Sequence, residues 1–289
     1  MISRERIIPI LATFFIINAS SAFFIGSGFG FTAQAKNIFH KDQASYAEVS
    51  TTSEQTLSNI ASSTEKIDLP ILVYHIVRPS YPDDSEAVRT LALTPEIFDA
   101  EMMYLDKTGH HIVSFSDLEN YFRSGTLLPD KPVIISFDDG WSDQFKYSFP
   151  TLKKYNFKAT FFVFTNSIGR HDFLTWEELQ EMLDAGMTIG SHSRSHPYLA
   201  NITDPDTLWD EIYGSKVLLE KHLGIHVNEF AYPFGQYNAD TVAMVVKAGY
   251  RSGRGDFYSG KQTADRLYEL SAMNAPTTME FFVMRFPSR

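Results

Sequence analysis

The stretch VIISFDDGWSDQF, Val133 to Phe145, joins an apolar run to two adjacent aspartates, a glycine and a tryptophan. The apolar half is typical of a strand that is buried on both faces, as strands are in a parallel sheet. Asp138 and Asp139 follow this strand directly. Parallel α/β folds build their sites at the carboxyl ends of their strands, so the two carboxylates are candidates for chemistry. Taken alone, Asp-Asp-Gly is equally well explained as a turn, with Gly140 supplying a positive φ.

Six further segments have strand character. They are PILVYH (70–75), HIVSF (111–115), KATFFVF (158–164), MTIGS (187–191), EFAYP (229–233) and, less clearly, YRSGRG (250–255). Segments with helical periodicity lie between them. Near-continuous apolar strands that alternate with helices predict an α/β fold with a parallel sheet covered on both sides, either a barrel or a doubly wound sheet.

Two of the expected helices have clear starts. One begins at Thr175, whose hydroxyl can cap the first turn with Glu178 closing the capping box, and it ends at Gly186. The other begins at Thr94 and Pro95 and places Phe98, Met102 and Leu105 on one face.

The composition restricts the class of protein. The 289 residues are 44% hydrophobic, which is enough for a substantial core, and the formal net charge is -10. This acidic balance argues against a nucleic-acid partner and favours an uncharged or weakly charged substrate. The chain has no cysteine, so no disulfide can stabilise it.

The N-terminal segment differs from the rest. Residues 1–35 combine Arg4 and Arg6, an apolar run from Ile7 to Phe24 and an Ala-Gln-Ala sequence at 33–35. This pattern predicts a signal peptide and therefore export to the cell envelope, the periplasm or the medium. The alternative is an uncleaved anchor that tethers the chain to a membrane. Residues 36–67 read as a Ser/Thr-rich linker, and residues 68–289 as one domain.

Two other polar clusters follow predicted strands. His192 and His196 come after MTIGS, and Pro233-Phe234-Gly235 comes after EFAY. Two histidines and a carboxylate at one rim of a sheet would make an open divalent-metal site. Successive side chains of an extended segment point in opposite directions, so one aspartate could bind the metal while its neighbour faces a reacting water.

A second pair with the same spacing has a structural explanation. His222 and His226 flank Gly224, which is typical of a helix end, and His222 would lie at the negative end of the helix dipole. We therefore do not expect this pair to bind metal.

The clusters resemble a known family. SFDDG (136–140), SHSRSHPYL (191–199) and FAYPFGQYN (230–238) are similar, in order, to the three motifs of the polysaccharide deacetylases, the NodB-homology group of carbohydrate esterases. The resemblance implies a distorted (β/α) barrel of about seven parallel strands. It also implies Asp138 as general base, and Asp139, His192 and His196 as ligands of one divalent metal, usually zinc, with cobalt or nickel as alternatives. The backbone N–H of Phe234 would help to hold the oxyanion.

The sequence departs from the family pattern at two places. Ala231 stands where many relatives carry an arginine that orients the base, and Arg251 and Arg254 are the candidates to replace it. The late segment LYELSAMNAPTT (267–278) contains no histidine to act as general acid. PILVYHIV (70–77) resembles a segment of the poly-N-acetylglucosamine deacetylases, which makes His75 the expected acid; His171 is the alternative. In a purely structural interpretation His75 is a buried histidine bonded to the backbone.

The resemblance implies a function. We expect an exported, metal-dependent hydrolase that removes N-acetyl groups from an N-acetylglucosamine-containing polysaccharide, either poly-N-acetylglucosamine or peptidoglycan. The alternatives are an O-deacetylase of an acetylated polysaccharide such as acetylxylan, and an inactive carbohydrate-binding relative. Aromatic residues that could stack on sugar are Trp141, Tyr232, Phe257 and Tyr258, although aromatics at such positions are more often part of a core.

Overall fold

The computed structural model describes residues 66–255 and 260–287. The expected leader, all but the last two residues of the expected linker, and Phe257 and Tyr258 lie outside these ranges. Within the described part of the chain, no helix is both long and apolar enough to cross a membrane.

The main sheet has seven parallel strands in the order β10-β9-β8-β7-β6-β2-β12, and a short strand, β5, pairs with the beginning of β6. The strands of this sheet are β2 (Ile71–Tyr74), β5 (His111–Ile112), β6 (Pro132–Phe137), β7 (Thr160–Val163), β8 (Thr188–Ser191), β9 (Glu229–Ala231), β10 (Ser252–Arg254) and β12 (Met273–Asn274). All seven segments expected to be strands contain one. The short pairs β1 (Lys66–Asp68) with β11 (Lys261–Thr263) and β3 (Ile76–Val77) with β4 (Ala92–Leu93) were not expected, because strands this short carry little pattern.

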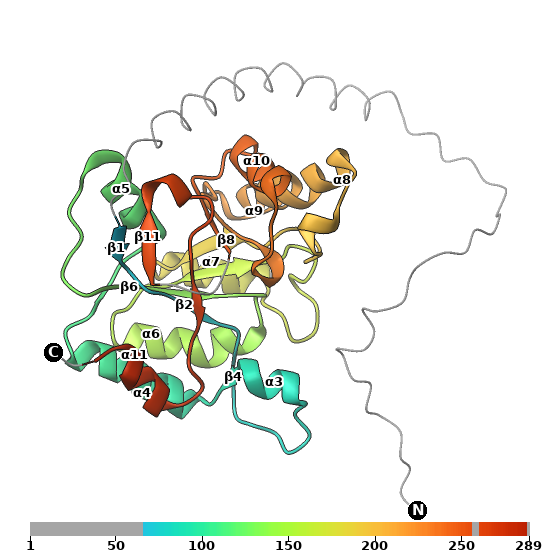
Figure 1. The fold of residues 1–289 in the computed structure, drawn as a ribbon. Coiled ribbons are helices and arrows are strands. Elements are labelled where there is room, and N and C mark those ends of the chain that lie inside the picture. The colour runs from blue at the N-terminus through green and yellow to red at the C-terminus, as the bar shows by residue number, and fades with distance from the viewer. Residues whose placement is uncertain (1–65, 256–259, 288–289) are drawn as a thin grey trace, which may run out of the picture. The chain divides into compact units, whose positions relative to one another are not determined.

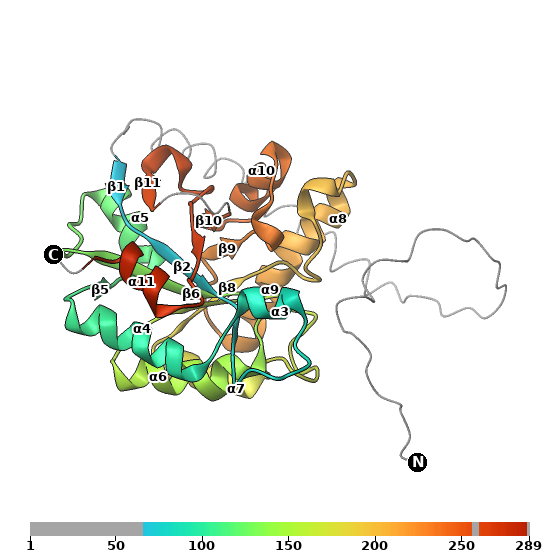
Figure 2. The ribbon, with the colours of Figure 1, turned by 60° about the horizontal axis from the view of Figure 1, so that its bottom comes forward.

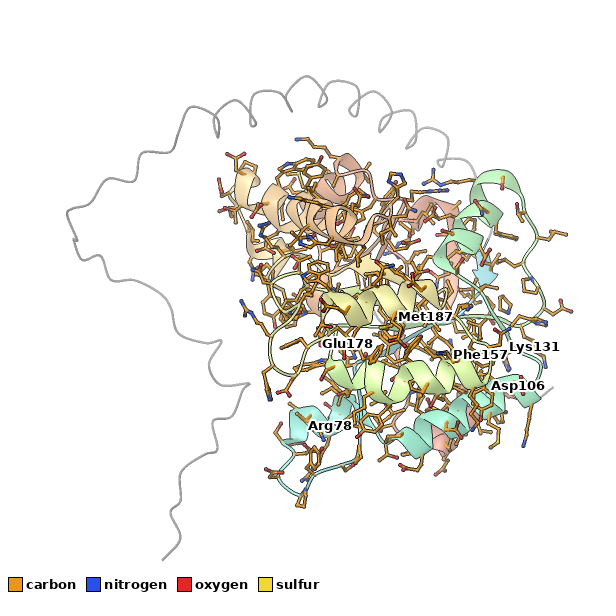
Figure 3. All side chains as sticks on the ribbon, turned by 180° about the vertical axis from the view of Figure 1, so that it is seen from behind. Arg78, Asp106, Lys131, Phe157, Glu178 and Met187 are labelled. Carbon is orange, nitrogen blue, oxygen red and sulfur yellow. The ribbon has the colours of Figure 1, made fainter. Side chains whose placement is uncertain are left out.

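Helices surround the sheet (Figures 1 and 2). The α-helices are α3 (Glu86–Leu91), α4 (Pro95–Lys107), α5 (Phe115–Ser124), α6 (Phe149–Lys154), α7 (Trp176–Asp184), α8 (Pro205–Trp209), α9 (Ser215–Leu223), α10 (Ala239–Lys247) and α11 (Met279–Arg285). Gln144–Ser148 (η1) and Asp210–Gly214 (η3) are π-helical, and Leu199–Asn201 (η2), Pro233–Gly235 (η4) and Ala264–Arg266 (η5) are 3-10 turns. Seen from behind, α7, α6 and α4 lie side by side across one face (Figure 3).

The two helices with clear sequence signals form as expected. Thr175 and Glu178 make the reciprocal capping box of α7, with hydrogen bonds of 3.2 and 2.8 Å. The helix stops before Gly186, which has a φ of 85°. In α4, Thr94 is the N-cap and Phe98, Met102 and Leu105 are buried. The strand expected at 111–115 is shorter than its apolar pattern, because Ser114 caps α5 in a capping box of its own.

The sheet curls into a distorted barrel. Leu270 pairs with Arg254 of the edge strand β10, and β12, which follows Leu270 at Met273, pairs with β2. The segment between them therefore connects the two edges of the sheet. This confirms the fold expected from the sequence.

Side chains alternate between the two faces of each strand, as strand geometry requires. Ile71, Val73, Ile134, Phe162 and Ala231 belong to an inner cluster, which α5 covers with Phe115 and Leu118. Their neighbours Leu72, Tyr74, Ile135, Phe137 and Tyr232 belong to the larger cluster between the sheet and the outer helices. Both faces are therefore buried, which explains the near-continuous apolar strands.

Candidate metal and catalytic site

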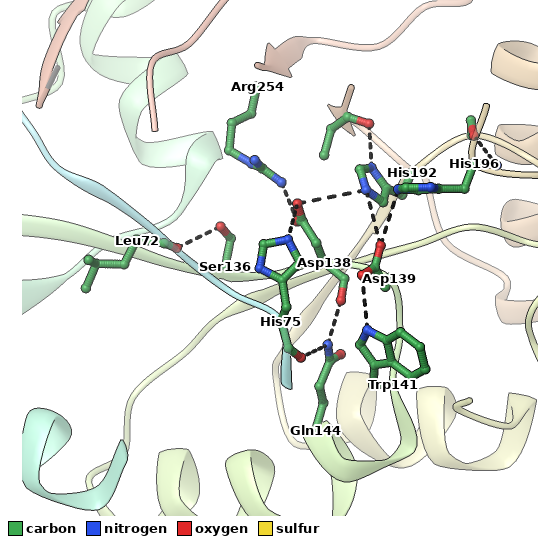
Figure 4. Close-up of polar contacts among 12 residues, drawn as sticks. Leu72, His75, Ser136, Asp138, Asp139, Trp141, Gln144, His192, His196 and Arg254 are labelled. Carbon is green, nitrogen blue, oxygen red and sulfur yellow. Dashed lines mark hydrogen bonds and ion pairs between the residues drawn. The ribbon is translucent and has the colours of Figure 1, made fainter. Parts of the chain in front are cut away.

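Polar side chains gather at the carboxyl ends of the parallel strands (Figure 4). His75 follows β2, Asp138 and Asp139 follow β6, His192 follows β8, and Arg254 is the last residue of β10. Because these strands run in one direction, segments that are far apart in sequence meet at one rim.

Asp139, His192 and His196 form a compact group. A carboxylate oxygen and one ring nitrogen of each histidine all lie within 4.8 Å of one another. Asp139 Oδ1 lies 3.3 Å from His196 Nε2 and 3.7 Å from His192 Nε2. The other oxygen, Oδ2, accepts a hydrogen bond of 3.0 Å from Trp141 Nε1. Trp141 thereby leaves Oδ1 to face the two imidazoles.

The hydrogen bonding of His192 prepares it to bind a metal. Its Nδ1 lies 2.7 Å from the carbonyl oxygen of Ala231. A carbonyl can only accept, so Nδ1 carries the proton and Nε2 presents its lone pair to the carboxylates. Burial lowers the pKa of His192 to about 4, so the ring is neutral at neutral pH. A backbone carbonyl that orients a histidine in this way is typical of metal sites.

The group fits a divalent cation. Two imidazole nitrogens and one carboxylate oxygen are donors that suit zinc and other transition metals, and three protein ligands would leave coordination positions open.

Asp138 has a different environment although it adjoins Asp139. Arg254 donates a hydrogen bond to Asp138 Oδ1. Oδ2 lies 3.9 Å from His75 Nε2 and 3.8 Å from His192 Nε2. Burial by itself would raise the pKa of Asp138, but the positive charge of Arg254, with smaller contributions from His192 and His75, lowers it to about 2. Asp138 is therefore ionised at neutral pH, with one oxygen held and the other facing histidines.

The two arginines considered as partners of Asp138 lie at opposite ends of β10. Arg254 is 1% exposed and contacts Asp138. Arg251 precedes the strand and pairs with Glu119 of α5, with 2.7 Å between Nε and Oε2. Three residue steps along the strand separate their Cα atoms by about 10 Å, so Arg251 is not placed to contact Asp138.

The loops of the site contain several residues with left-handed backbone conformation. Asp139, Ser193, His196 and Phe234 have φ values of 72, 68, 61 and 59°. Such conformations are uncommon outside glycine and tend to occur at functional sites. Gly140 has a φ of 75°, and a Cβ there would lie 2.8 Å from Val163 Cγ1, so glycine is required at this position for two reasons.

Stacked aromatic pairs lie beside the Asp-His-His group. Trp141 stacks on Phe173 with 4.6 Å between ring centroids, and Phe234 stacks on Tyr198 with 3.9 Å. The ring of Phe234 also contacts that of His196, and it is 44% exposed. Tyr198 could not be singled out from the sequence, because an aromatic residue after His-Pro has no distinctive spacing.

Tyr232 lies elsewhere. It directly follows β9 and is fully buried in the cluster between the sheet and the outer helices, where its hydroxyl donates to the carbonyl of Tyr268 at 2.9 Å. The alternation of side chains along the strand directs it away from the rim, so its ring packs in the core.

The remaining histidines singled out in the sequence are not at the site. His171 is 93% exposed and pairs with Asp172. His222 stacks on Trp176, and its Nδ1 lies 2.9 Å from the carbonyl of Leu218. The helix ends at Gly224, which has a φ of 66°, and His226 is 94% exposed.

Comparison with known proteins agrees with this architecture. The family model described as "Polysaccharide deacetylase" matches residues 127–253. The chain is 32% identical to the protein YxkH of Bacillus subtilis over 191 residues, which are 66% of this chain and 65% of that protein. Somewhat less than two thirds of that relative's length is therefore matched. This chain is also 25% identical to the poly-beta-1,6-N-acetyl-D-glucosamine N-deacetylase of Staphylococcus aureus (strain MRSA252) over 205 residues, which are 63% of this chain and 70% of that relative.

Solved structures show the same fold. The Streptococcus pyogenes deacetylase PplD, in complex with acetate, superposes with a TM-score of 0.70 at 26% identity, covering 78% of this chain and all of that one. IcaB from Ammonifex degensii superposes with a TM-score of 0.66 at 24% identity, covering 74% of this chain and 94% of its own. Residues 127–253 thus match the polysaccharide deacetylase family, and the chain resembles members of that family in sequence and fold.

Proposed function

We propose that this chain is a metal-dependent N-deacetylase of a polysaccharide that contains N-acetylglucosamine. The observation that carries the proposal is the position of His75, whose Nε2 lies 3.9 Å from Asp138 Oδ2 beside the Asp-His-His group. An amine leaving group is more basic than an alcohol and needs a proton to depart. An imidazole next to a carboxylate is suited to supply one.

The residues have distinct proposed roles. Asp139, His192 and His196 would hold the metal, which when bound polarises the acetyl carbonyl and acidifies a water. Asp138 Oδ2, the oxygen not held by Arg254, accepts the proton of the attacking water. The backbone N–H of Phe234 would donate a hydrogen bond to the oxyanion. His75 Nε2 protonates the departing nitrogen, and the products are acetate and a free amine on the sugar.

The choice of metal and substrate is part of the proposal. Two histidines and one carboxylate favour zinc, with cobalt and nickel able to bind the same donors. Relatives named as poly-beta-1,6-N-acetyl-D-glucosamine N-deacetylases support poly-N-acetylglucosamine, and peptidoglycan is the second candidate polymer. The expected leader at 1–35 would export the enzyme to where such polymers occur. Trp141 and Phe234, with their stacked partners, would provide apolar surface to the sugar rings.

A substrate panel tests the proposal. The purified protein should release acetate and expose amines on poly-N-acetylglucosamine or peptidoglycan, and a chelator should abolish both. Acetate release from acetylxylan alone, without new amines, would show an O-deacetylase. Sugar binding without acetate release from any polymer, including chitin oligomers, would show an inactive carbohydrate-binding relative.

A further inference from the structure

Gln144 joins the ends of the two strands that carry His75 and Asp138. Its Nε2 donates to the carbonyl of His75 at 2.9 Å and to the carbonyl of Asp138 at 2.6 Å (Figure 4). A primary amide has two N–H donors on one nitrogen, so a single side chain can serve both acceptors. Gln144 is fully buried, and its Oε1 has no hydrogen-bond partner among the described residues.

The bridge lies at the point where the sheet opens. The pairing of β2 with β6 ends at Tyr74 and Phe137, followed by one last hydrogen bond from Asp138 N to the carbonyl of Tyr74. Beyond this point the two segments diverge. The segment after β2 forms β3, which pairs with β4, and the segment after β6 turns through Asp139 and Gly140. His75 and Asp138 thus lie one residue past the regular ladder, where backbone pairing no longer sets their separation. The side chain of Gln144 replaces this backbone pairing as the link between the two segments.

Asp143, which precedes Gln144, contacts the same segment two residues after His75. Asp143 Oδ1 accepts a hydrogen bond of 3.0 Å from the backbone N–H of Val77. Asp143 and Gln144 therefore contact the chain on both sides of Ile76. Gln144 is also the first residue of the π-helical turn η1, a rare conformation that often occurs at functional sites.

We propose that Gln144 is a positioning residue that sets the distance between His75 and Asp138, with Asp143 in support. The inference rests on the proposed function, in which these two side chains act as acid and base. Neither amide contact reaches the reacting atoms, so Gln144 acts through the backbones that it joins. Displacements of about 1 Å at a catalytic group can lower a rate by roughly a hundredfold.

The chain offers a matched control. Gln262 is 2% exposed, and its Nε2 also joins two carbonyls, those of Leu69 at 3.1 Å and Ser271 at 2.7 Å. This second bridge lies before the beginning of β2, at the opposite end of the strand from His75. Gln144→Met and Gln262→Met each remove an amide bridge between two carbonyls at a buried position, and Gln262→Met also removes the hydrogen bond of 3.1 Å that Ser271 N donates to Gln262 Oε1.

The experiment compares these two variants with the parent. Both should melt at a lower temperature than the parent. Only Gln144→Met should lower kcat on an N-acetylated polymer, by about ten- to a hundredfold, with KM within about twofold and metal content unchanged. Parent kcat in Gln144→Met, or equal losses in both variants, would overturn the proposal. If Gln144→Met does not fold, Asp143→Ala takes its place, and parent kcat in that variant would count against the proposal in the same way.

A second measurement separates this proposal from the proposed function. The Hε1 proton resonance of His75, assigned with His75→Ala, should shift or broaden in Gln144→Met and stay at its parent position in Gln262→Met. This readout does not require turnover. If the parent releases no acetate, the deacetylase function is wrong, and the His75 resonance still decides whether Gln144 positions that side chain.

Discussion

Arg254 and Asp138 form a buried ion pair across the rim of the barrel, although they are 116 positions apart in the chain. Arg254 is 1% exposed and Asp138 is 3% exposed, so neither charge is compensated by bulk water. Arg254 belongs to β10 and Asp138 follows β6, and three strands of the sheet lie between them. The guanidinium thus reaches the carboxylate across the barrel.

Arg254→Met should destabilise the protein, because it leaves Asp138 buried without its counter-charge. Loss of one partner of a buried pair costs about 3–5 kcal/mol. The pKa of Asp138 is lowered to about 2 in the folded protein, so the stabilisation that it provides is present above about pH 4 and is lost as the pH falls through 2. The difference in unfolding free energy between parent and variant, measured in urea, should therefore be larger at pH 7 than at pH 3.

The same variant should change the pH dependence of activity. With Arg254 removed, the pKa of Asp138 rises, and the acidic limb of kcat/KM should move to higher pH. Arg251→Met is the control: it should lower stability, since Glu119 is buried and loses its partner, yet leave the acidic limb in place. An acidic limb at the same pH in Arg254→Met would show that Arg254 does not set the ionisation of Asp138.

His192→Ala and His196→Ala should each lose bound metal, because each removes one of three clustered donors. Metal content after dialysis, measured by mass spectrometry, provides the check. His226→Ala is the control, since His226 belongs to a pair with the same spacing but is 94% exposed. Full metal occupancy in both of the first two variants would place the metal elsewhere.

Asp138→Asn should keep the metal and lose turnover, because an amide cannot accept the proton of the attacking water. The expected loss in kcat is about 10² to 10⁴. Asp139→Asn should instead lower metal content. Near-parent activity of Asp138→Asn would assign the base to another carboxylate.

His75→Ala should affect substrates according to their leaving groups. On an N-acetylated polymer kcat should fall by about two orders of magnitude, while an activated acetate ester, which needs no proton to leave, should be hydrolysed at a rate much closer to that of the parent. Metal content and melting temperature should stay near those of the parent. Equal losses on the two substrates would show that His75 is not the general acid and has a structural role. His171→Ala, at a 93% exposed position, should leave both rates unchanged.

Glu101 should make stability depend on pH. It is fully buried on α4, and Tyr74 donates a hydrogen bond of 2.8 Å to its Oε2. Burial raises the pKa of Glu101 to about 8 in the folded protein, so between about pH 4.5 and 8 the folded state binds more protons than the unfolded state. The unfolding free energy should therefore fall as the pH rises through this window.

Glu101→Gln tests this origin of the slope. The variant should show a shallower fall in unfolding free energy between pH 5 and 8.5, by an amount of the order of a few kcal/mol. Part of the slope should remain in the variant, because burial also raises the pKa values of Asp143 and Glu229 to about 7. Glu177→Gln, at an exposed position of α7, should retain the parent slope, and an unchanged slope in Glu101→Gln would show that this carboxyl does not titrate in the window.

Local patterns in the sequence determined the secondary structure elements and their order. The apolar run before Asp138, the capping box at Thr175 and the glycine after the aspartates are decided by neighbours within a few residues, so the strands, two helices and their order could be predicted. Once the strands are parallel, polar residues that follow them must share one rim. That one of the two aspartates would meet His192 and His196 could thus be expected from position, whereas the choice of Asp139 came from the family resemblance.

The tertiary structure decided which side chains reach one another across the barrel. Arg251 and Arg254 are equivalent in the sequence, and only the direction and position of β10 place the second beside Asp138. Tyr232 faces outward and Phe234 lies at the rim because alternation along β9 and the turn after it set their directions. The bridge made by Gln144 depends on two carbonyls from separate strands, at the point where their pairing stops. Contacts of this kind depend on strand register and on the curl of the sheet, which no short stretch of sequence contains.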